Sequence, residues 1–575
     1  MCVRIHEINQ THEKETEIIM NYKELSELIY PSLAHTPEDY EVMYPPRDLP
    51  EGAMVTRLGP SPTGFIHLGN LYGAFVDERL AHQSGGTFFL RIEDTDDKRY
   101  VENAVETIIG SLDFFGIRFD EGVTESGDIG DYGDYTQSHR GEIYRTFAKK
   151  LLAEGLAYPC FLTEGEISAI REKQESEKIA PGIYAGWSKY RDWDKDEAVE
   201  TEVVSKIKAG EPFVIRLKSN GAPNASAEET ARHTVNDAIR GELSVPDNFL
   251  DVVIITQTGI PTYHFAHVVD DHLMRTTHVV RGEEWLPSLP IHVELFEDLG
   301  WDLPVYCHTA QLMKIGEDGN KRKLSKRHDP ELSLDFYRNE GYHPAAVREY
   351  LLTILNSNYE EWRIENPDAP AEDFKFTTEK MSSSGALFDL YKLNDVSKNA
   401  LLHIDAHELA AWLKSWSDEF APEYGYMFTD MGHIASILDL GRHDARPRAD
   451  LVYAKQIMDF ISYFFDESFE IKDEYPAEAA ADAKEILKAY LGSYDHSDDN
   501  GQWFDKIRDI AVSMGYAAKP KDFKKHPEDY KGHVGHVSTV IRIALMGRAQ
   551  SPDVWAIQQI MGEEKVRARL QAALQ

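Results

Sequence analysis

Cysteines are scarce in this sequence, and long apolar runs are missing. The chain has 575 residues and three cysteines, the widely separated Cys2, Cys160 and Cys307. An odd, scattered set is a poor disulfide framework and is typical of a reducing cytosol. No stretch approaches the roughly 20 apolar residues that a membrane-spanning helix needs, and the polar, acidic first residues lack the apolar core of a secretory signal. We therefore expect a cytoplasmic protein without a membrane partner.

Basic residues are also few. The chain has 61 lysines and arginines against 99 aspartates and glutamates, a net charge of −38. A chain of this charge repels nucleic acid at long range, which excludes a coat-type protein that binds DNA or RNA non-specifically. We expect no DNA partner, and any contact with RNA must come from local basic patches. A chain of this length is expected to hold several domains.

The most informative stretch runs from residue 54 to residue 96, MVTRLGPSPTGFIHLGNLYGAFVDERLAHQSGGTFFLRIEDTD. Residues 55–58 predict a buried strand, and the glycines and prolines of GPSPTG predict a stiff turn. The apolar spacing that follows predicts a one-sided helix that ends at residues 84–86, and residues 87–92 predict a second strand. His67 lies where the helix begins. Backbone N–H groups and the helix dipole favour a phosphate at that position.

A second basic motif, KLSKR, occupies residues 323–327. Lys323 and Lys326 flank a serine, and two lysines so placed can clamp a triphosphate and offset the charge that develops as pyrophosphate leaves. Taken singly, each motif has a simpler explanation, a capping histidine in one case and a solvated basic turn in the other. Together, in a chain that alternates strands and helices, they form a much more specific two-part signature.

The sequence resembles the class I aminoacyl-tRNA synthetases of the bacterial glutamyl type. GPSPTGFIHLGN and KLSKR are similar to the two ATP motifs of that family. The resemblance continues through FFLRIEDTD, YTQSHRGEIY, PFVIRLK, GIPTYHFAHVVDDHLMRTTHVVRGEEWLPSLPIHV, GALFDLYKL and WFDKIRDIA, and it covers nearly everything from about residue 53 onward. The sister glutaminyl enzymes carry Pro-Glu-Pro-Asn where this chain has PSPT at residues 60–63, so the glutamyl type is preferred.

The pattern of elements agrees with that family. Strands and helices alternate over the first 150 residues, with GVTESGDIGDYGDY (residues 122–135) expected as a loop, and no convincing strand follows about residue 385. The resemblance implies an α/β fold, a split Rossmann-type catalytic domain with an inserted α+β acceptor-stem domain, followed by an all-α C-terminal anticodon-binding domain. The expected parts are an N-terminal extension (1–50), the first half of the Rossmann catalytic domain (51–157), the inserted acceptor-stem-binding domain (158–250), the second catalytic half (251–310), the KLSKR loop and stem-contact region (311–385) and the helical anticodon-binding domain (386–575).

The resemblance implies ligation of L-glutamate to the 3′ end of tRNA(Glu) in two steps, through glutamyl-adenylate. No protein nucleophile is required, because the enzyme need only orient the reactants, bind charge and exclude water. The catalytic residues would be His67, Lys323 and Lys326, and Mg²⁺ would arrive with ATP, held largely by phosphate and water. The expected ATP-binding residues are Pro60, Thr63, Gly64, His67, Gly69, Asn70, Lys323, Leu324, Ser325, Lys326 and Arg327.

Two arginines are the best partners for the carboxylates of glutamate, because a guanidinium fork matches a carboxylate in two bonds. By family position Arg281 would take the side-chain carboxylate, with Arg57 nearby, and Glu93 would receive the α-ammonium group. Ser61 and Tyr263 would complete the pocket by hydrogen bonds. His267 either contacts the substrate or packs in the core.

Some features depart from the family pattern. Asn70 stands where the first motif often has a second histidine. Some members bind zinc through a Cys-x-Cys pair, but here Leu162 stands two residues after Cys160, so we predict no structural zinc and no other metal site. We expect Asp270, Asp271 and His272 to make structural hydrogen bonds. We expect the chain to be a monomer.

Two other functions stay open at this point. One is a paralogue that glutamylates a tRNA base, although such proteins lack the helical C-terminal third. The other is a synthetase-like RNA-binding module that has lost catalysis, which the intact His67, Lys323, Lys326, Arg57 and Arg281 oppose. Whether tRNA(Gln) is a second substrate depends on anticodon contacts that the sequence does not place.

Overall fold

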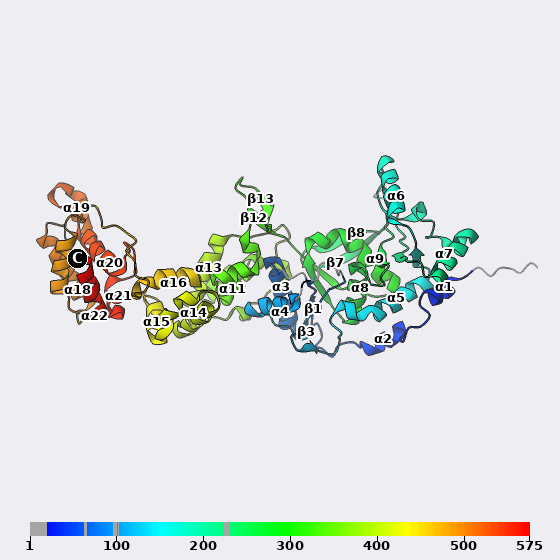
Figure 1. Ribbon diagram of the computed structural model, residues 1–575, viewed down its shortest axis with the longest axis horizontal. Coiled ribbons are helices and arrows are strands. Elements are labelled where there is room, and N and C mark those ends of the chain that lie inside the picture. The colour runs from blue at the N-terminus through cyan, green and yellow to red at the C-terminus, as the bar shows by residue number, and fades with distance from the viewer. Residues whose placement is uncertain (1–19, 63–65, 96–100, 102, 223–229) are drawn as a thin grey trace, which may run out of the picture. The chain divides into compact units, whose positions relative to one another are not determined.

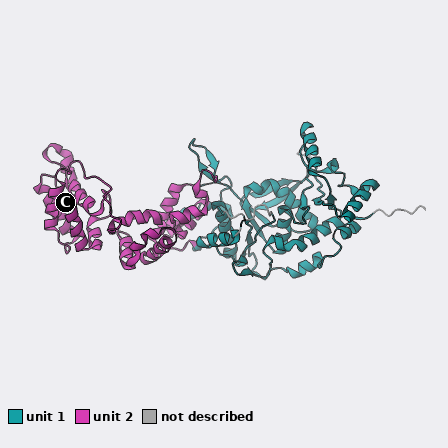
Figure 2. Cartoon of the chain, in the orientation of Figure 1, with its two compact units in different colours: residues 1–324, 355–360, 372–387 teal, residues 325–354, 361–371, 388–575 magenta. Residues whose placement is uncertain are grey.

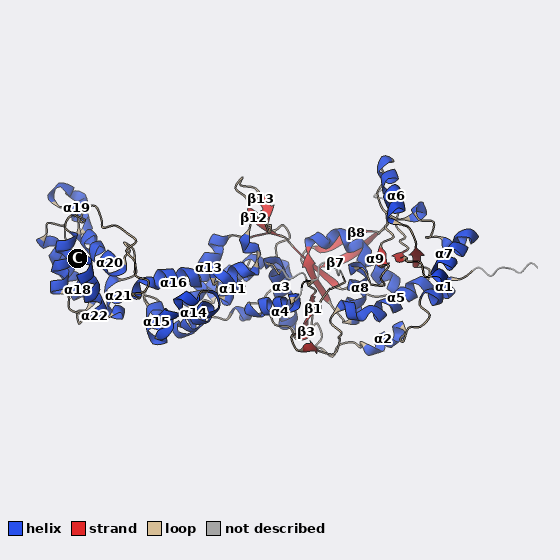
Figure 3. Cartoon of the chain, viewed as in Figure 1, coloured by secondary structure: helices blue, strands red, loops and turns tan. Residues whose placement is uncertain are grey.

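The computed structural model describes residues 20–62, 66–95, 101, 103–222 and 230–575. The chain forms two compact units, which Figure 2 distinguishes by colour. Unit 1 comprises residues 1–324, 355–360 and 372–387, and unit 2 comprises residues 325–354, 361–371 and 388–575. Figure 3 shows that the strands gather in unit 1 and that the C-terminal region is helical. None of the described helices is both long enough and apolar enough to cross a bilayer.

Unit 1 is built from short strands and the helices that connect them (Figure 1). Its helices are α1 (Tyr22–Ile29), α2 (Pro37–Met43), α3 (Leu68–Ser84), α4 (Ala104–Phe114), α5 (Gly141–Ala153), α6 (Glu164–Ser176), α7 (Glu197–Ala209), α8 (Tyr263–Leu273) and α9 (Leu289–Leu299). Its strands are β1 (Val55–Leu58), β2 (Thr87–Leu90), β3 (Glu121–Thr124), β4 (Gly127–Ile129), β5 (Ala157–Cys160), β6 (Val214–Leu217), β7 (Arg232–Asp237), β8 (Gly241–Pro246), β9 (Val253–Ile255), β10 (His278–Gly282), β11 (Val305–Thr309), β12 (Leu312–Ile315), β13 (Lys321–Lys323) and β14 (Ala386–Leu387).

Parallel strands form the centre of unit 1. β1 pairs with β2, β2 with β3, and β10 with β11, each in parallel. The Thr277 N–H, just before β10, donates to the Val55 carbonyl of β1 at 3.0 Å. β10 therefore lies beside β1, and the strands follow the order β3-β2-β1-β10-β11. Sheets with this order bind their ligands where it reverses, outside the carboxyl ends of β1 and β10.

The helix predicted after β1 is present as α3, but it is not one-sided. It ends at Gly85, whose φ of +71° is the left-handed conformation that favours glycine. The whole segment 74–81 is buried, including Arg79, which donates to the carbonyls of Glu372 at 3.0 Å and Phe374 at 2.6 Å. The polar face of α3 is thus covered by a segment of the same unit that lies almost 300 residues later in the sequence.

The loop predicted at residues 122–135 is wrong in its first half, because β3 and β4 form an antiparallel hairpin there. A glycine makes this possible. Gly122 has φ +123°, and a Cβ at this position would lie 2.3 Å from the Leu90 carbonyl oxygen of β2. Glycines and aspartates that indicate a loop by composition here permit a close approach between two strands.

The helices from the end of α13 (Leu390–Leu402) onward build an apolar core of their own. Leucine, isoleucine, methionine and aromatic side chains between Leu401 and Leu570 form one continuous buried cluster. The short strand β14 lies just past residue 385, where none was expected, and pairs in parallel with β12 in unit 1. The helices are α10 (Leu334–Glu340), α11 (Pro344–Leu355), α12 (Tyr359–Glu365), α13 (Leu390–Leu402), α14 (Ala406–Phe420), α15 (Met431–Asp439), α16 (Ala454–Ile461), α17 (Ala483–Ser493), α18 (Asn500–Ser513), α19 (Pro520–Lys525), α20 (Val534–Met546), α21 (Val554–Met561) and α22 (Glu563–Leu574).

Candidate active site

His67 is the N-cap of α3, at the turn that the sequence singled out. Its Nδ1 accepts the Asn70 N–H at 3.2 Å, and the Asn70 side-chain oxygen accepts the His67 N–H at 3.1 Å. The two residues form a reciprocal cap. Because Nδ1 serves as an acceptor, the neutral imidazole carries its proton on Nε2. Asn70 stands where the first motif of the family often has a second histidine, and its role here is to cap the helix.

The other candidate ATP residues of this turn lie around His67. A Cβ on Gly69 would lie 3.0 Å from the His67 ring, so the glycine keeps this side of the helix end open. Pro60 is buried and its carbonyl accepts the Glu93 N–H at 3.1 Å, whereas Ser61 is exposed. The predicted residues Thr63 and Gly64 lie outside the described part of the chain.

The KLSKR motif is divided between the two units. Lys323 and Leu324 belong to unit 1, where the Leu324 N–H donates to the Leu312 carbonyl of β12. Ser325, Lys326 and Arg327 belong to unit 2. There the Ser325 N–H donates to the carboxylate of buried Asp329 at 2.8 Å, which closes a turn. The side chains of the three basic residues are exposed.

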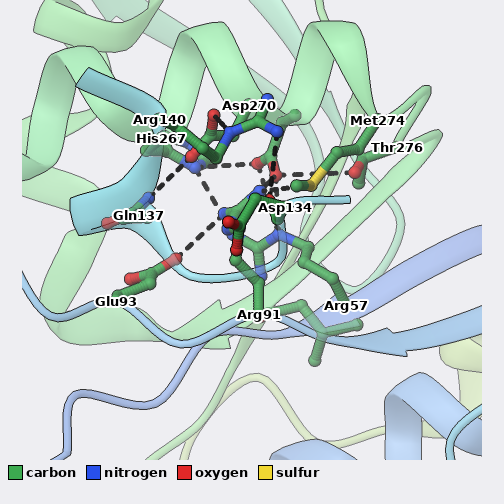
Figure 4. Close-up of polar contacts among 12 residues, drawn as sticks. Arg57, Arg91, Glu93, Asp134, Gln137, Arg140, His267, Asp270, Met274 and Thr276 are labelled. Carbon is green, nitrogen blue, oxygen red and sulfur yellow. Dashed lines mark hydrogen bonds and ion pairs between the residues drawn. The ribbon is translucent and has the colours of Figure 1, made fainter. Parts of the chain in front are cut away.

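Asp271 of α8 is the centre of a buried ion-pair network. Its two oxygens accept from Arg57 Nε at 3.1 and 3.2 Å, and Oδ1 also accepts from Arg91 Nη1 at 2.7 Å. His267, one turn earlier on α8, places Nδ1 2.8 Å from Oδ2. Arg91 in turn donates to Glu93 at 2.9 Å, and Figure 4 shows these two side chains meeting. The network joins β1, the end of the β2 segment and α8.

Burial and neighbouring charges set the protonation of this network. Burial alone would raise the pKa of Asp271, but the Arg57 and Arg91 guanidinium groups hold it well below its usual range. Burial raises the pKa of Glu93, although both arginines oppose the shift. Burial lowers the pKa of His267 to about 4, against the pull of Asp271, so this ring is neutral at pH 7. At neutral pH, Asp271 is therefore ionised and fixes both guanidinium groups.

Arg57 keeps part of its guanidinium available. Its Nε is committed to Asp271, but among the described residues Nη1 and Nη2 make only long contacts of 3.4 Å, to the Val280 carbonyl and to His267 Nδ1. Glu93 reaches this end of β1 because of Gly59, where a Cβ would lie 2.3 Å from Glu93 Oε1. The predicted Arg57 and Glu93 are thus brought together.

Arg281, on β10, is held by two histidines. Its Nε donates to His308 Nε2 at 3.0 Å, and its Nη1 lies 3.0 Å from His292 Nδ1. His308 is fixed in turn by the Asp237 carboxylate, 2.7 Å from its Nδ1. Burial lowers the pKa of both histidines, so the neutral rings can accept from a guanidinium. Arg281 is 8% exposed, and its Nη2 has no hydrogen-bond partner among the described residues.

Tyr263 lies at the start of α8 between the two arginine sites. Its ring stacks on His267 with centroids 5.7 Å apart and tilts against Trp285 at 4.4 Å. Burial, reinforced by the charge of Glu93, raises the pKa of Tyr263 to about 12. The phenol therefore stays protonated and can donate a hydrogen bond. His267 is fully buried, and its Nε2 has no hydrogen-bond partner in the described chain.

The sequence analysis missed the residues that hold the predicted ones in place. Arg91, His292 and His308 were not proposed, and Asp271 was expected only to make structural hydrogen bonds. One signal could have indicated Arg91, because an arginine inside the apolar run FFLRI must be paired when it is buried. The histidines carry no such signal, because a lone histidine on an apolar helix or strand is common.

The residues around Asp270 hydrogen-bond to separate partners. Asp270 accepts from Arg140 at 2.8 Å, Gln137 at 2.9 Å and the Tyr144 hydroxyl at 2.7 Å. His272 lies 2.7 Å from the Glu41 carboxylate. Figure 4 shows Arg140 and Gln137 meeting Asp270 beside the Arg91 network. Asp270 and His272 therefore make the structural hydrogen bonds that were expected, whereas Asp271 also anchors Arg57 and Arg91.

Comparisons with known proteins cover almost the whole chain. Residues 53–395 match the family described as "tRNA synthetases class I (E and Q), catalytic domain", and residues 408–574 match "Anticodon binding domain". A protein named glutamate–tRNA ligase from Acetivibrio thermocellus is 59% identical over 558 residues, 96% of this chain and 100% of that protein. One of the same name from Clostridium perfringens strain 13 is 47% identical with the same coverage.

A solved structure agrees with these sequence matches. It is a glutamate tRNA ligase from Elizabethkingia meningosepticum in complex with its amino acid, 27% identical, with a TM-score of 0.70 over 91% of this chain and 99% of that chain. The expected fold class, a Rossmann-type α/β catalytic domain followed by a helical anticodon-binding domain, is confirmed. The matching catalytic region, residues 53–395, spans more than half of this chain. The chain therefore belongs to the class I tRNA synthetases for glutamate and glutamine (E and Q).

Proposed function

We propose that this chain is a glutamate–tRNA ligase, which activates L-glutamate with ATP and transfers it to the 3′ end of tRNA(Glu). The observation that carries the choice of amino acid is the buried Nη2 of Arg281 at the carboxyl end of β10, which has no hydrogen-bond partner in the part of the chain that the structure describes. An anionic carboxylate satisfies a buried guanidinium better than a neutral amide does, because it supplies both acceptors and charge. The site therefore favours glutamate over glutamine.

Two of the three charged groups of glutamate, the side-chain carboxylate and the α-ammonium group, would have a partner of opposite charge. Arg281 would bind the side-chain carboxylate, with the terminal nitrogens of Arg57 close by. Glu93 would accept the α-ammonium group, whose positive charge favours the ionised form that burial disfavours. Ser61 and the protonated Tyr263 hydroxyl would add neutral hydrogen bonds. His267 is proposed to act mainly by packing against Tyr263 and by its contact with Asp271.

The reaction needs positioned charge and no protein nucleophile. The α-carboxylate of glutamate attacks the α-phosphorus of ATP, and the bond to the pyrophosphate oxygen breaks. A ribose hydroxyl of tRNA then attacks the acyl carbon and AMP leaves. His67 would donate from Nε2 to a phosphate oxygen, while Lys323 and Lys326 would offset the charge on the β- and γ-phosphates.

We propose Mg²⁺ as a companion of ATP, held largely by phosphate and water oxygens. The site carboxylates fit this role poorly, because Asp271 and Glu93 are already paired with arginines. We propose no structural zinc. Cys160 is buried, with its thiol 3.8 Å from the Ser188 hydroxyl, and Leu162 stands where a second thiol would be needed.

Replacing His67 by asparagine is expected to separate its two roles. Asparagine caps a helix as well as any residue, so the free energy of unfolding should change by less than about 0.5 kcal/mol. The loss of the Nε2 donor should lower kcat for adenylate formation by roughly 100- to 1,000-fold. The matched variant His67→Ala loses the cap as well and should cost a further ~1 kcal/mol of stability. An H67N enzyme with wild-type kcat would show that the ring does not act on the phosphates.

The activity itself is tested by ATP–pyrophosphate exchange with glutamate, in the presence and absence of tRNA(Glu). We expect exchange with glutamate and tRNA, and charging of tRNA(Glu) with radiolabelled glutamate. Replacing glutamate by glutamine should abolish the exchange signal. A parallel charging assay with tRNA(Gln) decides whether that tRNA is a second acceptor. If no tRNA supports exchange, the chain is an inactive RNA-binding relative and the proposal is wrong.

A further inference from the structure

The residues just before β1 form a strap that lies against the end of α8. The N-terminal strap, defined here as residues 36–49, contains α2 and the extended segment that follows it. Three of its residues, spaced three apart, turn toward the same short stretch of chain: Glu41, Tyr44 and Arg47. That stretch, residues 272–275, is the end of α8 and the turn that leads toward β10.

Polar contacts from Glu41, Tyr44 and Arg47 hold the turn at residues 272–275. The Glu41 carboxylate lies 2.7 Å from His272 Nε2 and accepts from Arg275 Nη2 at 2.8 Å. The Tyr44 carbonyl accepts from Arg275 Nε at 2.9 Å, and Arg47 Nε donates to the Met274 carbonyl at 3.0 Å. Arg275 is a non-glycine residue with φ +60°. A conformation of this cost persists only where its surroundings hold it.

A second set of contacts leads from the strap to Asp270. The Tyr44 hydroxyl accepts from Arg140 Nη1 at 3.0 Å and donates to the Gly133 carbonyl at 3.1 Å. Arg140 in turn donates from Nε to Asp270 at 2.8 Å. Tyr44 is 6% exposed and Asp270 is fully buried, so these bonds are shielded from water.

Arg47 ties the strap to the neighbouring sheet. It makes two bonds to Glu121 of β3, at 2.7 and 3.0 Å, and its guanidinium lies 3.8 Å from the centre of the Tyr132 ring. The Tyr132 hydroxyl donates back to the Pro45 carbonyl at 2.8 Å. The strap is thus anchored on β3 on one side and on the end of α8 on the other.

Helix α8 is the element on which the glutamate site depends. It carries Tyr263, His267 and Asp271, and Asp271 fixes Arg57 and, through Arg91, Glu93. We propose that the N-terminal strap positions α8 for glutamate binding, with Glu41 and Tyr44 as positioning residues that contact neither substrate. This inference rests on the proposed function. It assigns to the strap a role in binding glutamate and no role in binding ATP.

The test uses the full-length enzyme with Glu41→Gln, Tyr44→Phe and the double variant. Each substitution keeps the shape of the side chain and removes only a charge or a hydroxyl. We expect KM for glutamate to rise about 5- to 20-fold in the double variant, less than the roughly 100-fold that a full 1 Å misplacement of a binding group can cost. KM for ATP should stay within about twofold, because the side chains of Glu41 and Tyr44 contact the end of α8, Gly133 and Arg140 and not the helix that begins after His67. Glu38→Gln, an exposed carboxylate on the same helix, is the matched control and should leave both constants unchanged.

The possible results separate the claims. If both KM values rise together, or neither changes, the strap does not position the glutamate site and the inference is wrong. A fall in the urea midpoint without a change in KM for glutamate would also overturn it, as a purely structural strap behaves in that way. If the double variant does not fold, the two single variants decide by the same comparison. A wild-type enzyme without glutamate-dependent exchange would instead overturn the proposed function.

Discussion

Replacing Arg281 by lysine is expected to lower kcat/KM for glutamate by roughly 30- to 5,000-fold, the equivalent of about 2–5 kcal/mol for breaking a buried charged hydrogen bond. Lysine keeps the positive charge but loses the planar fork. His308 and His292 each accept one Arg281 nitrogen, at 3.0 Å, and an ammonium group cannot satisfy both while it also faces a substrate carboxylate. ATP–pyrophosphate exchange at varied glutamate concentration measures the effect.

A control variant shows whether the effect on kcat/KM is specific to Arg281. Arg232→Lys is the matched control, because Arg232 is an exposed arginine on β7 of the same sheet, bonded to Ser244. It should leave kcat/KM within about twofold of wild type. KM for ATP should be unaffected in both variants. An R281K enzyme with a wild-type KM for glutamate would show that the side-chain carboxylate binds elsewhere.

Asp271→Asn is expected to have the largest effect on stability. The substitution leaves Arg57 and Arg91 buried without the charge that pairs them, and removing one partner of a buried ion pair costs roughly 3–5 kcal/mol. The Asp271 side chain is fully buried, as is that of Arg91. Urea unfolding followed by tryptophan fluorescence should show an earlier loss of unit 1. Exchange activity should fall as well, since Arg57 and Glu93 lose their common anchor.

The pH dependence gives an independent check of this effect. The folded pKa of Asp271 is well below its ordinary value, because the two arginines favour its ionised form. Its contribution to stability is therefore complete above a pH of about 4 and is lost as the pH falls through the folded pKa. The Asn variant should lack this part of the acid dependence. Asp113→Asn, an exposed carboxylate on α4, should change the free energy of unfolding by less than ~0.5 kcal/mol. An equal effect of both substitutions would mean that the buried network does not stabilise the fold.

Local sequence was sufficient to predict features that depend on residues close together in the chain. The turn before α3, the capping histidine and the alternation of strands and helices follow from glycine, proline and apolar spacing, all of which operate over a few residues. The arginines in VTRLG and HVVRG were assigned to the carboxylates of glutamate because a guanidinium fork matches a carboxylate in two bonds, and that assignment stays a prediction. Local signals failed at β3 and β4, where a glycine-rich segment forms a hairpin because it must approach β2 closely.

The sequence by itself determined the family pattern, and it predicted two motifs for ATP and the charged residues for glutamate. Only the tertiary structure decided which partners hold those residues. Asp271 pairs with Arg57 across 214 positions and with Arg91 across 180 positions of the chain. The tertiary structure also showed that the strap at residues 36–49, to which the sequence assigned no role, reaches α8 through Glu41, Tyr44 and Arg47. The physical reason is that burial is a property of the folded chain. The sequence indicates that a buried charge must be paired, but the packing of strands and helices selects its partner.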